Sequence, residues 1–494
     1  MQKSSPDTSG SITARVTRGF LWNLLSKGCL WGTKLLKLVV VARFLEPSQL
    51  GLFGVVVLAV QALQIFSTTG VKVALIRRED APKEMLDQGW SVRAVRGCAL
   101  GLVLSIAAPL VASFFELPQV VPLLRVMAVV PVLAGFGNIG VVFFNRQLDF
   151  RRLFLYNGIS ELTGFVVAVI LIWKTRSVWA LVWSRIAVEA TRLTMSYVLH
   201  TYRPRARWST ENASELFRFG RWIFGSVVVT FLATNLDDAV VGKVVGAGAL
   251  GLYQIAYRFS DMPLTQLGGV VCRVMLPAYA RIQNEPERLA RGFLKAVEAI
   301  SALIFPLALT LALVADELVV TMLGEQWRGA VAAIQILALT GSLRSLLGSG
   351  TAIFLALGKG RTNFMMKLMG SVVMAVAVVP LTATMGITGT ALAVGIGLVA
   401  MMYFYAKVME VAGVRLKDIL TGLRTGLLLS ALCAGGVWAG FALPFETGFV
   451  RLGAAFAGAG LFYAVGVGLA TWWMGTDIFL KTISSLTENL RGGK

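Results

Sequence analysis

The sequence has few of the residues on which most catalytic and metal sites depend. Among 494 residues there is one histidine, His200, and the four cysteines lie far apart. No histidine-dependent triad or histidine-rich metal site can be assembled from these, and no cysteine pair has metal-ligand spacing. The phosphate-binding pattern G-x-x-x-x-G-K-[ST] is also missing. We therefore predict a protein that is not an enzyme, with no catalytic residue, no bound metal and no cofactor.

Charged residues are scarce as well, and the composition is that of a protein in lipid. They make up 15% of the chain against 56% hydrophobic residues, and the mean hydropathy is +0.74. Since lipid offers the backbone no hydrogen bonds, long apolar windows must form helices. We predict an all-α integral membrane protein of about 14 transmembrane helices of roughly 20 residues each, at roughly 19–41, 50–69, 95–114, 123–144, 153–173, 178–199, 219–241, 250–276, 290–314, 331–357, 364–383, 387–409, 420–442 and 449–473.

The net charge of +20 would suggest a nucleic-acid partner in a soluble protein, but the location of the cations explains it. Thirty of the 46 lysines and arginines fall in the two tails and in alternate loops. The opposite loops hold only Arg43, Arg125, Lys174, Arg176, Lys243, Arg328 and Arg451. The positive-inside rule therefore predicts cytoplasmic N- and C-termini and an even number of helices. No nucleic-acid partner is expected.

Two segments 200 residues apart share a pattern. Residues 41–53 align without gaps to 241–253, and four of the 13 positions are identical. Six predicted helices lie between the copies, so both have the same orientation and an axis along the membrane normal would relate them. This predicts two six-helix lobes in a parallel pseudo-two-fold repeat plus a C-terminal helix pair. The expected divisions are 1–202 (N-lobe), 203–411 (C-lobe), 412–475 (helix pair) and 476–494 (cytoplasmic amphipathic tail).

Ionisable residues inside predicted spans are costly and mark a cavity or a partner. In the first helix, Lys27, Lys34 and Lys37 recur at spacings of seven and three, which confines them to an arc of about 80°. The alternative to a cationic cavity wall is that Lys27 and Lys37 extend toward opposite membrane surfaces. Under the 200-residue offset, Lys37 corresponds to Asp237, which Asp238 follows.

Other predicted spans hold further charges. Arg258 and Asp261 are three residues apart and either neutralise each other or line the cavity. Arg185 and Arg192 flank Glu189, and because one carboxylate cannot neutralise both, an unpaired cation is expected there. Glu161 and Arg344 have no partner nearby in the sequence and receive no role.

A cavity wall made mostly of lysine and arginine suits an anionic head group, and phosphate above all. The predicted substrate-binding residues are Lys27, Lys34, Lys37, Asp237, Asp238, Arg258, Asp261, Arg185 and Arg192.

The two repeated segments resemble motifs of a known family, the polysaccharide transporters or Wzx-type oligosaccharide flippases of the MOP (multidrug/oligosaccharidyl-lipid/polysaccharide) superfamily. The family pattern A-R-x-L-G-P-x-x-[FY]-G-x-[FY] is matched at Ala42, Arg43, Leu45, Pro47, Gly51 and Phe53. The sequence departs from it at Glu46 and Leu50. The second-lobe pattern D-x3-[IV]-G-x3-G-x3-[LV]-G-x-Y-x2-A is similar to Asp237, Val241, Gly242, Gly246, Leu250, Gly251, Tyr253 and Ala256.

The resemblance implies a two-lobed, MATE-like transporter in a bacterial inner membrane. Such a protein would export undecaprenyl-diphosphate-linked repeat units of an exopolysaccharide, such as succinoglycan or colanic acid, by alternating access. By similarity, Lys27, Lys34 and Lys37 would face Asp237 and Arg258 across the cavity. The implied partners are this lipid-linked oligosaccharide, membrane lipids and a polysaccharide polymerase or co-polymerase.

Three alternatives stay open from the residues. A lipid II flippase or an ion-coupled small-molecule exporter would belong to the same superfamily, although such an exporter uses acidic groups and here the cations in the spans outnumber them. A membrane glycosyltransferase or polymerase is the alternative from another class. That activity needs acidic groups in a sizeable outward loop, and the predicted outward loops are short.

Overall fold

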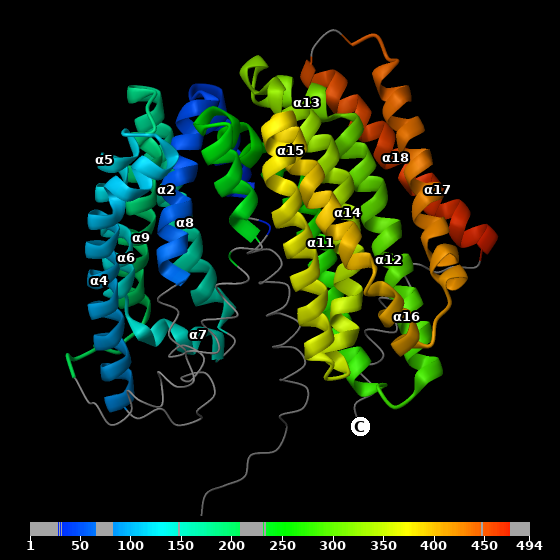
Figure 1. Cartoon of the computed structure of the whole chain (residues 1–494), viewed down its shortest axis with the longest axis horizontal. Helices are drawn as coiled ribbons and strands as arrows, with labels where there is room; N and C mark the ends of the chain where they lie inside the picture. The colour runs from blue at the N-terminus through cyan, green and yellow to red at the C-terminus, as the bar shows by residue number, and fades with distance from the viewer. Residues whose placement is uncertain are drawn as a thin grey trace, which may run out of the picture. The chain divides into compact units, whose positions relative to one another are not determined.

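The computed structural model describes residues 28, 30, 32–65, 83–146, 149–207, 231, 234–445 and 448–474. Every regular element in these ranges is a helix (Figure 1), which confirms the all-α prediction. Eight helices of the described chain are long and apolar enough to cross a membrane. Lys27 and the predicted tail helix at 476–494 lie outside the described residues. The chain divides into two compact units, Met1–Gly251 and Leu252–Lys494.

The first unit is built from helices that follow one another along the chain. It includes helical segments at 32–44 and 234–244 and the first turn of α11, together with α2 (Pro47–Ile65), α4 (Lys83–Phe115), α5 (Val120–Met127), α6 (Val129–Gly135), the 3-10 turn η1 (Ile139–Val141), α7 (Val142–Arg146), α8 (Phe150–Thr175) and α9 (Trp179–Leu199). Consecutive helices α8 and α9 pack along each other, and α4 packs on α5 and α6.

The predicted span at 123–144 is wrong as a single helix, because the chain breaks there into α5, α6, η1 and α7. Pro131 lies near the start of α6. Its ring has no N–H and clashes with the carbonyl four residues earlier, which favours the break between α5 and α6. After α6, Asn138 turns the chain with extended backbone angles, and its side chain accepts a hydrogen bond from the Gly140 N–H.

The second unit continues from α11 (Ala247–Arg281). It contains α12 (Pro286–Leu313), α13 (Ala315–Met322), the 3-10 helix η2 (Glu325–Ala330), α14 (Val331–Ala356), α15 (Gly360–Met402), α16 (Tyr405–Ala412), α17 (Leu416–Phe441) and α18 (Gly448–Met474). Helix α12 packs against both α14 and α17, and α17 packs along α18. The last two helices lie side by side in Figure 1, in orange and red.

Helix α15 is a hairpin of two arms. Gly386 has φ 60° and ψ −140° inside it, a conformation that glycine adopts without strain. The hydroxyls of Thr382 and Thr390 are 2.7 Å apart across the bend, and Gly370 in the first arm packs against Gly397 in the second. Two helices were predicted here, at 364–383 and 387–409, and the two arms agree with that division.

Glycines let α17 and α18 approach each other closely. A Cβ at Gly436 would lie 2.4 Å from the carbonyl oxygen of Gly458, and a Cβ at Gly458 would lie 2.2 Å from that of Gly436. One turn later, a Cβ at Gly440 would lie 2.5 Å from the Ala454 carbonyl oxygen. Such spacing of small residues is typical of helices packed within a membrane, where van der Waals contact replaces the hydrophobic driving force.

The α17–α18 contact leads to a stability prediction. Gly436→Leu should lower the thermal unfolding midpoint of the purified protein in detergent, because overpacking of a close contact costs roughly 1–3 kcal/mol. Gly453→Leu on α18 is the matched control, since a Cβ at Gly453 meets nothing within 4 Å. Equal midpoints for the two variants would contradict the close packing described here.

Candidate functional site

Lys37 is held inside the first unit by a relay through α9 to α8. Its ammonium Nζ donates to the Ser184 hydroxyl oxygen at 2.5 Å. The Ser184 hydroxyl in turn donates to the Gly164 carbonyl oxygen at 2.6 Å. Lys37 is half-buried, whereas Lys34, one turn earlier on the same helical segment, is exposed. The two lysines of the predicted stripe that the structure describes therefore have different surroundings.

Two arginines and two glutamates form a balanced network between α8 and α9. The guanidinium of Arg192 donates to Glu189 and to Glu161, both at 2.8 Å. Arg185 lies 3.1 Å from the same oxygen of Glu189. The prediction that one of these arginines is left unpaired is therefore wrong. The second carboxylate, Glu161, lies on α8 and pairs with Arg192. Nothing in the local sequence of α9 indicates this partner.

Two further arginines, Arg93 and Arg96, fall just before and at the start of the predicted span 95–114. Both lie on α4 within the candidate span Leu86–Phe115 and are only partly exposed. Arg93 donates to the Ala134 carbonyl oxygen of α6 at 2.8 Å, and no carboxylate pairs with it among the described residues. Extending the predicted span by one turn toward its N-terminus would have included Arg93 as well.

The acidic pair Asp237 and Asp238 lies on the helical segment at 234–244. Asp237 is buried, with 6% of its surface exposed, and Asp238 is half-buried. A carboxylate at such a depth requires polar surroundings to remain charged. The opposition of Asp237 to Lys37 stays a prediction.

In the second unit, the ion pair differs from the one that the sequence suggested. Arg344 on α14 lies 3.0 Å from Asp261 on α11. The guanidinium of Arg344 also donates to the Tyr257 hydroxyl, at 2.5 Å, and lies over its ring. Asp261 is buried, whereas Arg258 is exposed. Asp261 is therefore neutralised by Arg344 and not by Arg258. Arg344 is the residue that has no partner nearby in the sequence.

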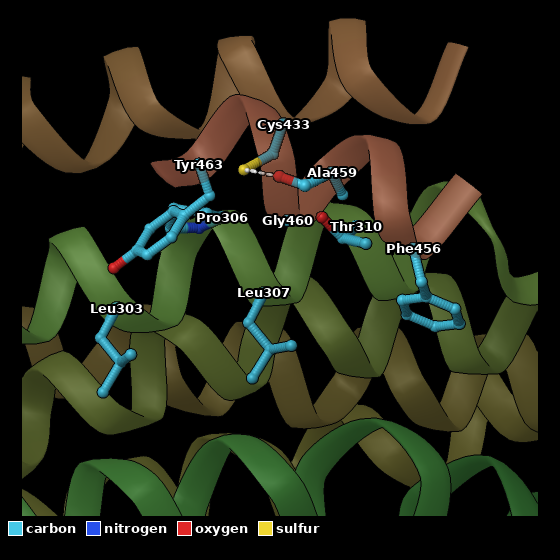
Figure 2. Close-up of a pocket in the computed structure, with 9 residues that line it drawn as sticks. All are labelled: Leu303, Pro306, Leu307, Thr310, Cys433, Phe456, Ala459, Gly460 and Tyr463. Atoms are coloured by element: carbon cyan, nitrogen blue, oxygen red, sulfur yellow. Dashed lines mark hydrogen bonds between the residues drawn. The ribbon is translucent and has the colours of Figure 1, made fainter. Parts of the chain in front are cut away.

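A cavity of about 270 Å³ opens between α12, α17 and α18. Figure 2 shows the rings of Tyr463 and Phe456 extending from α18 toward α12. The walls are mostly apolar, with Leu303 and Leu307 on the α12 side. Cys433 donates through its thiol to the Ala459 carbonyl oxygen at 3.5 Å. The chemistry of this cavity suits an apolar chain rather than a charged head group.

The Arg344–Asp261 pair can be tested against the pair expected from the sequence. Arg344→Met should destabilise the protein by about 3 kcal/mol, because it leaves a buried carboxylate without its cation. Arg258→Met removes an exposed side chain and should change stability by less than about 0.5 kcal/mol. Chemical unfolding in mixed micelles, followed by circular dichroism, measures both. A larger effect for Arg258→Met would restore the pairing that the sequence suggested.

Comparison with known proteins gives this arrangement a context. The profile of a family described as "polysaccharide biosynthesis protein" matches residues 40–332. The teichuronic acid biosynthesis protein TuaB of Bacillus subtilis is 26% identical over 356 residues, covering 72% of this chain and 74% of TuaB. The succinoglycan biosynthesis transport protein ExoT of Rhizobium meliloti is 25% identical, covering 72% of each chain. The lipopolysaccharide biosynthesis protein WzxC of Escherichia coli is 24% identical over 342 residues, covering 68% of this chain and 69% of WzxC.

Solved structures show the same fold. The inward closed conformation of the lipid II flippase MurJ aligns with a TM-score of 0.75, at 15% identity, over 92% of this chain and 99% of that one. An inward-facing MATE multidrug transporter of the MOP superfamily aligns with a TM-score of 0.59, at 18% identity, over 78% and 95%.

These matches agree with the motifs around Gly51 and Gly251 and with the membrane-spanning helices. The chain is a multi-pass membrane protein that belongs to the polysaccharide biosynthesis protein family.

Proposed function

We propose that this protein moves an undecaprenyl-diphosphate-linked oligosaccharide outward across a bacterial inner membrane, for the synthesis of an exopolysaccharide. Two lobes related by a parallel two-fold axis would alternate between inward-open and outward-open states, with both termini in the cytoplasm. The diphosphate would bind the cations of the cavity while the polyprenyl chain stays in the lipid. A polymerase that consumes the oligosaccharide outside is the protein partner that we propose.

The observation that carries this proposal is the way in which the first unit holds its cations. A backbone carbonyl oxygen accepts from the Arg93 guanidinium, and no carboxylate pairs with Arg93 among the described residues. Neutral oxygens of this kind orient a lysine or arginine without cancelling its charge. Such a cation can then bind a phosphate through charge-assisted hydrogen bonds, which are about twice as strong as neutral ones. A site for a cationic drug would require the opposite charge.

The apolar cavity in the second unit supports a substrate that carries a lipid. Leucine and aromatic side chains line it, and its polar groups are the side chains of Thr310, Cys433 and Tyr463. An isoprenoid chain needs such an environment, because apolar surface gains roughly 25 cal/mol per Å² when it leaves water. Within membranes, the same walls provide van der Waals contact in place of lipid.

A reciprocal contact between α2 and the first turn of α11 supports the two-fold repeat. A Cβ at Gly51 would lie 1.6 Å from the Ala247 carbonyl oxygen, and a Cβ at Gly251 would lie 2.0 Å from the Pro47 carbonyl oxygen. Each residue of one contact corresponds to a residue of the other under the 200-residue offset. When residue i meets j and their equivalents meet in the reverse order, a two-fold axis passes through the contact.

Transport itself can be measured in liposomes that contain the purified protein and fluorescent lipid-linked oligosaccharides. The Lys34→Ala/Lys37→Ala double variant should lose outward movement of the substrate while inserting normally, because two cations for the diphosphate are removed. Lys174→Ala, at the exposed end of α8, is the matched control and should transport normally. Normal transport by the double variant would refute the cationic cavity. Movement of lipid II alone would show that the substrate class is wrong.

The glycine contact gives an independent test of the repeat. Gly51→Ala and Gly251→Ala should each reduce transport strongly, and to a similar degree, because each added methyl group forces the same two helices apart. Gly248→Ala in the same turn is the control, since a Cβ there meets nothing within 4 Å. The double variant should be little worse than either single variant, because both changes disrupt one contact. Loss of transport in only one of the single variants would contradict the two-fold relation.

A further inference from the structure

The chain that follows α9 forms an extended strap, residues 200–207, fixed to the start of α4. The buried carboxylate of Asp87 accepts hydrogen bonds from the Tyr202 hydroxyl and, at 2.9 Å, from the Arg205 backbone N–H. The Ser91 hydroxyl oxygen accepts from the Arg207 backbone N–H at 2.9 Å. Both α4 residues are buried. The backbone of this segment is therefore anchored at alternate residues.

The other end of the strap is anchored near η1. The side-chain amide of Asn138 donates to the Tyr202 carbonyl oxygen at 2.6 Å. The ring of His200 packs against Phe143 and Phe144, and its Nδ1 accepts from the Tyr202 N–H at 3.0 Å. Burial, together with the positive charges of Arg152 and Arg203, lowers the pKa of His200. The neutral ring that accepts this hydrogen bond is thus favoured at neutral pH.

This anchoring presents arginines on the outer side of the strap. Successive side chains of an extended chain point to opposite sides. Tyr202 and Pro204 are accordingly half-buried, whereas Arg203, Arg205 and Arg207 are exposed. The guanidinium of Arg203 is fixed over the Tyr197 ring and donates to the His200 carbonyl oxygen at 2.6 Å.

The first turn of α8 extends this basic surface. Arg152 lies over Phe144, the ring that contacts His200, and the exposed Arg151 precedes it. We name Arg151, Arg152, Arg203, Arg205 and Arg207 the strap patch. Within the part of the chain that the structure describes, two ion pairs involve the strap patch: Arg152 lies 3.4 Å from Asp149, and Arg207 lies 3.6 Å from Glu84. The side chains of Arg151 and Arg205 have no hydrogen-bond or ion-pair partner among the described residues.

The strap patch lies where membrane-spanning helices end. The candidate spans of α4 and α8 begin at Leu86 and Arg151, next to the anchor at Asp87 and within the patch itself. Phosphate groups of lipids occupy this level of a bilayer, and basic residues there attract anionic lipids. We propose that the strap patch is a binding site for the phosphate of an anionic phospholipid, with Arg151 and Arg205 as its principal ligands.

A direct test counts phosphatidylglycerol molecules retained by the full-length protein in native mass spectrometry, over a titration in detergent. At about 1 kcal/mol for each arginine near an anionic surface, Arg151→Gln/Arg205→Gln should weaken binding about 20- to 30-fold. Arg151→Lys/Arg205→Lys keeps both charges and should stay within a few-fold of the parent protein. Phosphatidylcholine should bind equally to all of these proteins.

The matched control is Arg281→Gln/Arg361→Gln, which removes two exposed arginines from helix ends of the second unit. It should bind phosphatidylglycerol within twofold of the parent protein. An equal loss in the control would overturn the proposal, because it would show a general effect of net charge. Binding of polyprenyl diphosphate without binding of phosphatidylglycerol would overturn it too. None of these measurements depends on transport. A negative result here would therefore leave the proposed function intact, and a failed transport assay would leave this lipid site intact.

Discussion

Lipid offers no hydrogen-bond partners, and this constraint governs the structure at every level. The backbone satisfies it by forming a helix in each candidate membrane span of the described chain. The polar side chains satisfy it by finding partners on other helices: Arg192 binds a glutamate of α8, Arg344 binds an aspartate of α11, and Lys37 binds a serine of α9. These polar contacts hold the helices in register, since breaking any of them would leave a charge in a medium that cannot solvate it.

Close backbone contact is the second consequence of a lipid solvent. Without a hydrophobic driving force between helices, association depends on van der Waals contact, and glycine maximises it. The contacts of Gly436 with Gly458 and of Gly51 with Ala247 both depend on the absence of a Cβ. The first joins two neighbouring helices in sequence, and the second joins segments 200 residues apart. Both therefore explain why the sequence keeps glycine inside apolar helices, where it otherwise destabilises.

The two kinds of charged site in the first unit have different chemistry. Each cation is matched by a carboxylate in the network of Arg185, Glu189, Arg192 and Glu161. This network therefore stabilises the packing of α8 against α9. Arg93 is instead oriented by a neutral carbonyl oxygen, which preserves its attraction for an anion. The proposed substrate, a diphosphate attached to a lipid, combines this anion with an apolar chain of the kind that the α12–α17–α18 cavity suits.

Composition and hydropathy alone determined the fold class, because a helix that crosses lipid needs a long apolar run and little else. The family was identified from the two motifs around Gly51 and Gly251. The interruption at Pro131 was missed because a short break does not remove the apolar character of the window. The repeated motif includes Gly51 and Gly251, but their reciprocal contact is a property of the folded chain. Only the tertiary structure decided which cation pairs with which carboxylate. Asp261 pairs with Arg344 rather than with Arg258 because spatial proximity between helices, which spacing along one helix does not encode, determines which charges meet.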